Sequence, residues 1–204
     1  MKFENTKVMN FEGSIRGMRN PLESWARSDS KYDENGEYIV GPNDLGLMQR
    51  LLKASIVQGN SHSKFLRQIL VSVDLTAPLY WWKEADQYRV GVTTNSESTM
   101  HRLAKTPITL DCFETDDYDP DLSLAYDRED DDYDDGLDDI SVYVEDMIMV
   151  MENLRKAYLA TGDKRYWKEL IRLLPEGWLQ KRTTTLNYQV LRQMYFDRRH
   201  HKLT

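Results

Sequence analysis

The chain has 204 residues, of which 40% are hydrophobic, and a formal net charge of −7. This length fits one large domain, or one domain with an insert, and 12 tyrosines and 5 tryptophans can supply a core. No apolar run approaches the roughly 18 residues of a membrane span, and the first residues hold no apolar signal core, so we expect a cytoplasmic protein without a membrane partner. The single cysteine, Cys112, excludes an intrachain disulfide and a zinc site built on cysteine pairs.

The negative charge is concentrated in one segment. Residues 111–139 hold fifteen acidic residues and one basic residue, Arg128, which gives a local charge of −14. We interpret them as an exposed insert, whose role is that of a solvating loop, a calcium site or a mimic of the charge of DNA. Its spacing does not follow the twelve-residue calcium loop. The other 175 residues carry 26 basic and 19 acidic residues, or +7, which suits an anionic ligand such as a nucleotide.

Apolar periods and turn signals predict four elements before residue 60. They are a strand over 2–10, a short helix over 11–18, a hairpin around Asn35-Gly36, and a helix from Pro42 to near Gly59. Further along, the same signals predict a strand over 70–74, a helix that opens at Pro78, and helices over 140–159 and 164–174.

The last thirty residues carry the most informative pattern. Pro175 ends a helix, and a threonine-rich extended run leads to a final helix for which Thr184 and Thr185 are candidate caps. In that helix Asn187 and Arg198 would lie on one face, about 16 Å apart. An Asn can read an amide-like ring edge, and an Arg can hold a carbonyl or an anion. The alternative is an ordinary amphipathic helix with a polar end.

Leu174-Pro175, Asn187 twelve residues after the proline, and Arg198 eleven residues later resemble the C-terminal half of the flavin-dependent thymidylate synthases, the ThyX family. The resemblance implies that Asn187 lies near the flavin and that Arg198 holds the pyrimidine of dUMP. It also suggests a phosphate role for Arg172, although Arg172 is one residue closer to the proline than the family's arginine.

Two central segments extend the resemblance. His62-Ser63-Lys64-Phe65 is similar to the family's His-x-x-x-Phe segment beside the flavin, one residue shorter. In the signature Arg-His-Arg-x-x-Ser-x-Asn-x-x-Ser-x-Arg-Tyr, three residues fall in register, namely Thr93, Asn95 and Ser98. Arg89 stands at the family's His, and three family arginines are replaced, by Tyr88, Val90 and Met100. A tight loop of Ser and Asn can cradle a phosphate with backbone N–H groups and hydroxyls.

The resemblance therefore implies a set of site residues. Catalytic roles fall to Ser98 and Arg198, substrate-binding roles to Ser96, Glu97, Ser98, Arg172 and Arg198, and cofactor-binding roles to His62, Ser63, Arg89, Asn95 and Asn187. We assign no metal ligand and expect no nucleic-acid partner.

The implied fold is α+β, an antiparallel sheet packed with helices, in a single domain over residues 1–204 with the acidic loop insert at about 111–139. The implied assembly is a homotetramer. The implied activity is the reductive methylation of dUMP to dTMP, with FAD as cofactor and NADPH and methylenetetrahydrofolate as cosubstrates. The alternative is a non-catalytic nucleotide-binding or interaction protein on the same scaffold, with the acidic insert as its contact surface.

Overall fold

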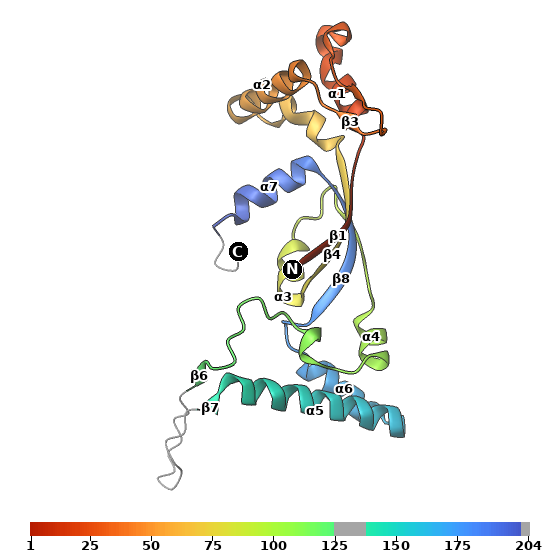
Figure 1. Ribbon diagram of the computed structural model, residues 1–204, viewed down its shortest axis with the longest axis vertical. Helices are drawn as coiled ribbons and strands as arrows, with labels where there is room; N and C mark the ends of the chain where they lie inside the picture. Colours follow the sequence, from red (N-terminus) through yellow and green to blue (C-terminus); the bar gives the residue numbers. More distant parts are fainter. Residues whose placement is uncertain (125–137, 201–204) are drawn as a thin grey trace. The chain divides into compact units, whose positions relative to one another are not determined.

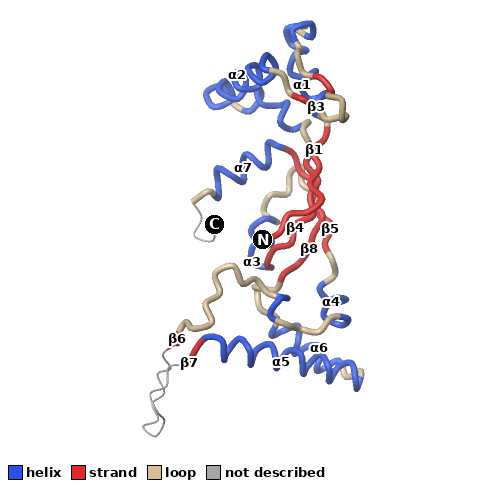
Figure 2. The backbone as a smooth tube through the Cα atoms, viewed as in Figure 1, coloured by secondary structure: helices blue, strands red, loops and turns tan. Residues whose placement is uncertain are grey.

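The computed structural model describes residues 1–124 and 138–200 (Figure 1). They form two compact units: unit 1 comprises Met1–Lys2, Thr76–Glu84 and Ser96–Lys181, and unit 2 comprises Phe3–Leu75, Ala85–Asn95 and the residues from Arg182 onward. Four strands form one antiparallel sheet in the order β1 (Lys2–Met9), β4 (Leu70–Pro78), β8 (Leu179–Asn187) and β5 (Thr93–Ser96), drawn in red in Figure 2. The predicted α+β class is confirmed, whereas the single domain stays a prediction.

Unit 2 contains the elements predicted for the N-terminal part of the chain. They are α1 (Phe11–Arg19), the hairpin of β2 (Lys31–Tyr32) and β3 (Tyr38–Ile39), and α2 (Pro42–Gln58). A 3-10 helix over Asn60–Arg67 follows α2, and two short 3-10 turns, Asn20–Leu22 and Trp25–Arg27, follow α1. The hairpin turns at Gly36, whose φ of 81° is one that glycine adopts without strain. The core of this unit is apolar and is formed by Ile15, Met48, Phe65, Leu66 and Ile69.

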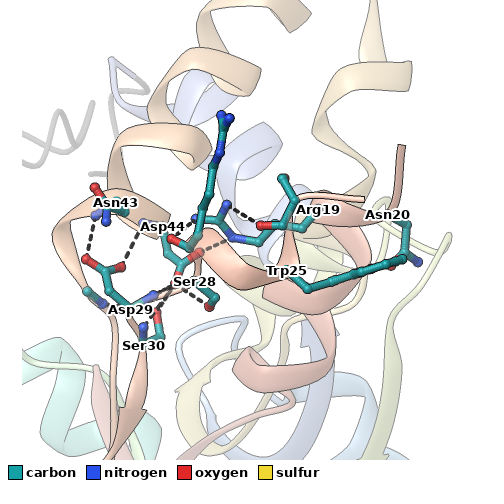
Figure 3. Close-up of polar contacts among 11 residues, drawn as sticks. Arg19, Asn20, Trp25, Ser28, Asp29, Ser30, Asn43 and Asp44 are labelled. Atoms are coloured by element: carbon teal, nitrogen blue, oxygen red, sulfur yellow. Dashed lines mark hydrogen bonds and ion pairs between the residues drawn. The ribbon is translucent and has the colours of Figure 1, made fainter. Parts of the chain in front are cut away.

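A buried ion pair joins α1 to α2 (Figure 3). Arg19 Nε donates to Asp44 Oδ1 at 2.6 Å, and the two side chains are 4% and 0% exposed. The other carboxylate oxygen accepts from the hydroxyls of Ser28 and Ser30, at 2.8 and 2.6 Å, and from the backbone N–H of Asp29 and Ser30. The Arg19 guanidinium also donates to two backbone carbonyls between α1 and β2. This segment is therefore ordered around one satisfied carboxylate.

Unit 1 is built on two helices that lie side by side, α5 (Ile140–Thr161) and α6 (Lys164–Leu173), as Figure 1 shows. The apolar stripe predicted for residues 140–159 packs into its core through Met147, Ile148, Met151 and Leu154. Two shorter helices, α3 (Leu79–Ala85) and α4 (Thr99–Lys105), and a 3-10 turn at Leu110–Cys112 precede α5. Trp178 lies at the centre of the core, fully buried against the edge of Phe113.

The acidic segment begins later than we expected. Cys112 and Phe113 lie inside the predicted boundary of 111, but they are buried members of the unit 1 core. The boundary was placed too early because it was drawn from a charge count, which does not distinguish apolar residues from their acidic neighbours. The strands β6 (Ser123–Leu124) and β7 (Asp138–Asp139) pair antiparallel. Residues 125–137 of the predicted insert lie outside the described residues.

The start of the final helix also differs from the prediction. Thr184 and Thr185 lie within β8, and α7 begins at Tyr188 and ends at Arg198. Its cap is Asn187, whose Oδ1 accepts from the Val190 N–H at 3.1 Å. Threonine fits a strand as well as a cap because of its β-branched side chain, so the run continues the strand to Asn187. Figure 2 shows α7 leaving β8 directly.

Among the described residues, no helix combines the length and the apolar character needed to span a membrane.

Candidate functional site

A cavity of about 560 Å³ opens within unit 2. Its walls come from the segment that follows α3, from the N-terminal half of α7 and from the end of the 3-10 helix Asn60–Arg67. Two of the lining residues are arginines and five others have polar side chains; the full lining is Arg67, Gln87, Tyr88, Arg89, Val90, Gly91, Asn187, Gln189, Val190 and Gln193. The volume is within the range of roughly 300–1,000 Å³ that small-molecule sites occupy. We name this cavity the α7 pocket.

Two predicted cofactor-binding residues, Arg89 and Asn187, lie on the walls of the α7 pocket. The Val190 N–H can only donate, so it fixes Asn187 with Oδ1 toward the helix and leaves Nδ2 on the other side. A Cβ at Gly91 would lie 2.6 Å from that Nδ2, and Gly91 has a φ of 77°. Glycine at this position therefore lets the backbone of one wall approach the cap of α7.

Arg198, predicted to hold the pyrimidine, is half-buried and bonded to the wall of the α7 pocket. Its Nε donates to the Tyr88 hydroxyl at 3.4 Å, and one terminal nitrogen donates to Gln87 Oε1 at 3.3 Å. The Tyr88 hydroxyl in turn donates to Asp197 Oδ2 at 3.1 Å. Tyr88, at a position where the resemblance predicts an arginine, thus contacts Arg198.

The predicted His62 and Ser63 lie on the 3-10 helix Asn60–Arg67. Ser63 is buried, and its hydroxyl donates to Gln189 Oε1 at 3.2 Å, so it holds a side chain of the pocket wall. His62 is half-buried and is not part of the lining. Of this pair, Ser63 is the residue that the structure links to the α7 pocket.

The segment predicted to form a phosphate-cradling loop is instead a strand followed by a helix. Asn95 and Ser96 are exposed residues of β5, an edge strand, and Ser98 is the N-cap of α4, where its Oγ accepts from the His101 N–H at 3.3 Å. The tight-loop prediction was wrong because four consecutive polar residues, 93–96, pair at the sheet edge without any apolar alternation.

The two other predicted substrate residues bond within unit 1. Glu97 Oε1 accepts from Arg102 at 3.0 Å and from the Lys181 N–H at 3.0 Å. Arg172 pairs with Glu169 at 2.8 Å on the exposed face of α6. The predicted residues are therefore divided between the units, with Arg89, Asn187, Ser63 and Arg198 gathered at the α7 pocket.

Eight of the ten wall residues were not among our predicted site residues, and four of these eight have amide or cationic side chains: Arg67, Gln87, Gln189 and Gln193. For Gln189 the sequence did offer a signal, because the family that the chain resembles often has an arginine at this position. Arg67 and Gln193 belong to segments far apart in the sequence, and no local pattern brings them together.

Solved structures supply the comparison for this fold. Thymidylate synthase X from Helicobacter pylori, solved with FAD and dUMP, matches with a TM-score of 0.61 and 16% identity, over 99% of this chain and 86% of its own. PolB from Streptomyces cacaoi, a UMP/dUMP methylase bound with 5-Br dUMP, matches with a TM-score of 0.57 and 16% identity, over 96% of this chain and 76% of its own. No protein-family model and no curated protein sequence matches the chain. At these identities the likeness establishes a ThyX-like fold.

Proposed function

We propose that the chain is a divergent flavin-dependent thymidylate synthase-like enzyme that converts dUMP to dTMP with methylenetetrahydrofolate and NADPH. One observation carries the proposal: Arg89 and Asn187, far apart in the sequence, line the same pocket of ligand size. Arg198, the third residue of the resemblance, is bonded to two residues of the same wall.

The chemistry of the lining suits a nucleotide or a flavin ring. Four amide side chains, Gln87, Asn187, Gln189 and Gln193, can match the alternating carbonyl and N–H groups of a pyrimidine or isoalloxazine edge. The guanidinium of Arg89 suits a carbonyl or a phosphate. Arg89 and Asn187 would hold the flavin, with Ser63 fixing Gln189 behind it. When bound, flavin supplies the hydride chemistry that the reaction requires.

Arg198→Ala is expected to weaken dUMP binding by about 1.5–3 kcal/mol, roughly ten- to hundred-fold, because a charge-assisted hydrogen bond is lost. Isothermal titration calorimetry with dUMP measures the change. Arg199→Ala is the matched control, since the Arg199 guanidinium lies over the rings of Tyr195 and Phe196, at 5.9 and 5.2 Å from their centroids. Equal losses in both variants would contradict a pyrimidine-binding role for Arg198.

A second candidate is a non-catalytic nucleotide-binding protein. The replacements of family arginines favour it, because the Tyr88 hydroxyl bonds to Arg198 and Asp197, and the Val90 side chain is 89% exposed. The visible absorption spectrum of the purified protein after incubation with FAD separates the two functions. Bound flavin together with dUMP-dependent oxidation of NADPH supports the enzyme, and nucleotide binding without flavin uptake supports the binder.

We also expect the chain to form a homotetramer. The α7 helix exposes Leu191, Tyr195 and Phe196, which are 39%, 61% and 49% accessible, and such neighbouring apolar side chains are typical of a surface that another chain covers. Light scattering at micromolar concentration should give four times the 24.1 kDa chain mass. A single-chain mass would contradict the assembly.

A further inference from the structure

Two cationic side chains on the walls of the α7 pocket lack an acidic partner. Arg67 is exposed at the end of its 3-10 helix and forms no ion pair with any residue in the ranges 1–124 and 138–200. Arg89 donates Nε to the Asp86 carbonyl at 3.2 Å and likewise has no ion pair within those ranges. Their terminal nitrogens therefore retain donor capacity in the planar arrangement that matches phosphate oxygens.

Two carboxylates that adjoin or bond to wall residues, Asp86 and Asp197, already have hydrogen-bond partners. Asp86 accepts two bonds from Arg182, at 2.9 and 3.1 Å. Asp197 accepts from Tyr88 on one oxygen and from Gln193 on the other, at 3.1 and 2.7 Å. Among residues 1–124 and 138–200, no acidic side chain lines the pocket. The α7 pocket therefore has an excess of positive charge, which favours an anionic ligand group.

Arg67 adds a second guanidinium to the wall of the α7 pocket. Tyr88 and Val90 leave their segment with Arg89 as its only guanidinium, and Arg67 brings a second one from a different element. Arg102 does not have this freedom, because it bonds to Glu97 and to the Leu179 carbonyl and lies over the Trp178 ring.

We infer that Arg67 and Arg89 form a phosphate-monoester subsite of the α7 pocket, with Arg67 as its principal charge. The inference rests on the proposed function, since it identifies which end of the nucleotide the cations hold. The phosphate of dUMP is a monoester, and so is that of FMN, whereas the phosphates of FAD form a pyrophosphate. A preference for FMN would therefore assign the subsite to a flavin other than FAD.

The test compares each phosphorylated ligand with its dephosphorylated partner, dUMP with deoxyuridine and FMN with riboflavin. In the wild-type protein at least one phosphorylated ligand should bind about ten- to hundred-fold more tightly than its partner. Arg67→Gln should abolish most of that preference and leave binding of the dephosphorylated partner nearly unchanged. The pair that shows the preference identifies the source of the phosphate.

Arg50→Gln is the control, because Arg50 is an exposed arginine of α2 that does not line the pocket. Arg50→Gln should retain the full preference for the phosphorylated ligand, and Arg67→Lys should retain part of that preference. A preference that persists in Arg67→Gln, or its absence from the wild-type protein for both pairs, would overturn the subsite. If deoxyuridine binds tightly and dUMP binds no better, the subsite alone is contradicted. If FMN binds better than riboflavin but neither dUMP nor deoxyuridine binds, the proposed substrate alone is contradicted.

Discussion

Asp44→Ala is expected to lower the free energy of unfolding of unit 2 by about 3–5 kcal/mol, because it leaves the buried Arg19 guanidinium without a counter-charge. Arg19 and Asp44 are 4% and 0% exposed, so solvent cannot replace the lost carboxylate. The Ser28 and Ser30 hydroxyls and two backbone N–H groups would lose their acceptor as well. Chemical denaturation, monitored by the hydrogen exchange of the backbone amides of α1 and α2, measures the loss of stability.

The matched control is Asp33→Ala in the hairpin. Asp33 accepts from two backbone N–H groups but is exposed, so its removal should lower stability by about 1 kcal/mol or less. Similar losses for the two aspartates would contradict the role assigned to burial of the Arg19–Asp44 pair.

The same carboxylate predicts a dependence on pH. Burial alone would raise the pKa of Asp44, but hydrogen bonds from Ser30, Ser28 and Arg19 outweigh it and lower the pKa to about 2. Because the folded pKa is below the unfolded value of about 3.9, the stabilisation is fully present above pH 4 and is lost as the pH falls toward 2. Asp44→Ala should remove this part of the acid sensitivity.

Glu152→Gln is expected to destabilise unit 1 by about 2–4 kcal/mol. Glu152 accepts two bonds from Arg155, both at 2.7 Å, and a third from the Ile108 N–H at 2.9 Å, and the two side chains are 14% and 9% exposed. Hydrogen bonds from Arg155 lower the pKa of Glu152 to about 2 against the opposing effect of burial, and the Ile108 N–H adds to the lowering. A neutral amide would remove the charge that balances Arg155 and place a donor against other donors.

The neighbouring helix offers a matched pair for this substitution. Glu169 and Arg172 have the same i,i+3 spacing, and one Arg172 nitrogen donates to both oxygens of Glu169, but the two side chains are 46% and 70% exposed. Glu169→Gln should therefore change the free energy of unfolding by about 0–1 kcal/mol. Thermal melts of both variants, monitored by circular dichroism, test whether the buried, fully bonded pair contributes more stability than the exposed one.

The elements that the sequence predicted well are those whose side-chain period reflects burial. Along β4, alternate residues such as Val71, Val73 and Leu75 are buried, and the stripe of α5 faces the core through Met151. β5 has no such period, since all four of its residues are polar and exposed at the sheet edge. The pattern of residues 93–96 therefore gave no sign of a strand.

The candidate site was predictable only in part for a related reason. Spacing in the chain identified Asn187 and Arg198, because both lie in the C-terminal segment whose pattern resembles the family. Arg67 reaches the α7 pocket through tertiary packing of the 3-10 helix near α7, which no local pattern encodes. The role proposed for Arg67 also depends on the partners of Asp86 and Asp197, which are known only from the folded chain.

The hydrogen bond that caps α7 at Asn187 makes the exchange rate of one backbone amide sensitive to the ligand in the α7 pocket. Its Oδ1 closes the first turn of α7 on the Val190 N–H, while the same side chain lines the wall. A ligand N–H that displaces the Val190 N–H from Oδ1 opens this turn, and the Val190 amide hydrogen then exchanges faster with deuterated solvent. A ligand that accepts from Nδ2 keeps the turn closed and slows that exchange. The exchange rate of a single amide thus distinguishes a ligand edge that presents a carbonyl from one that presents an N–H.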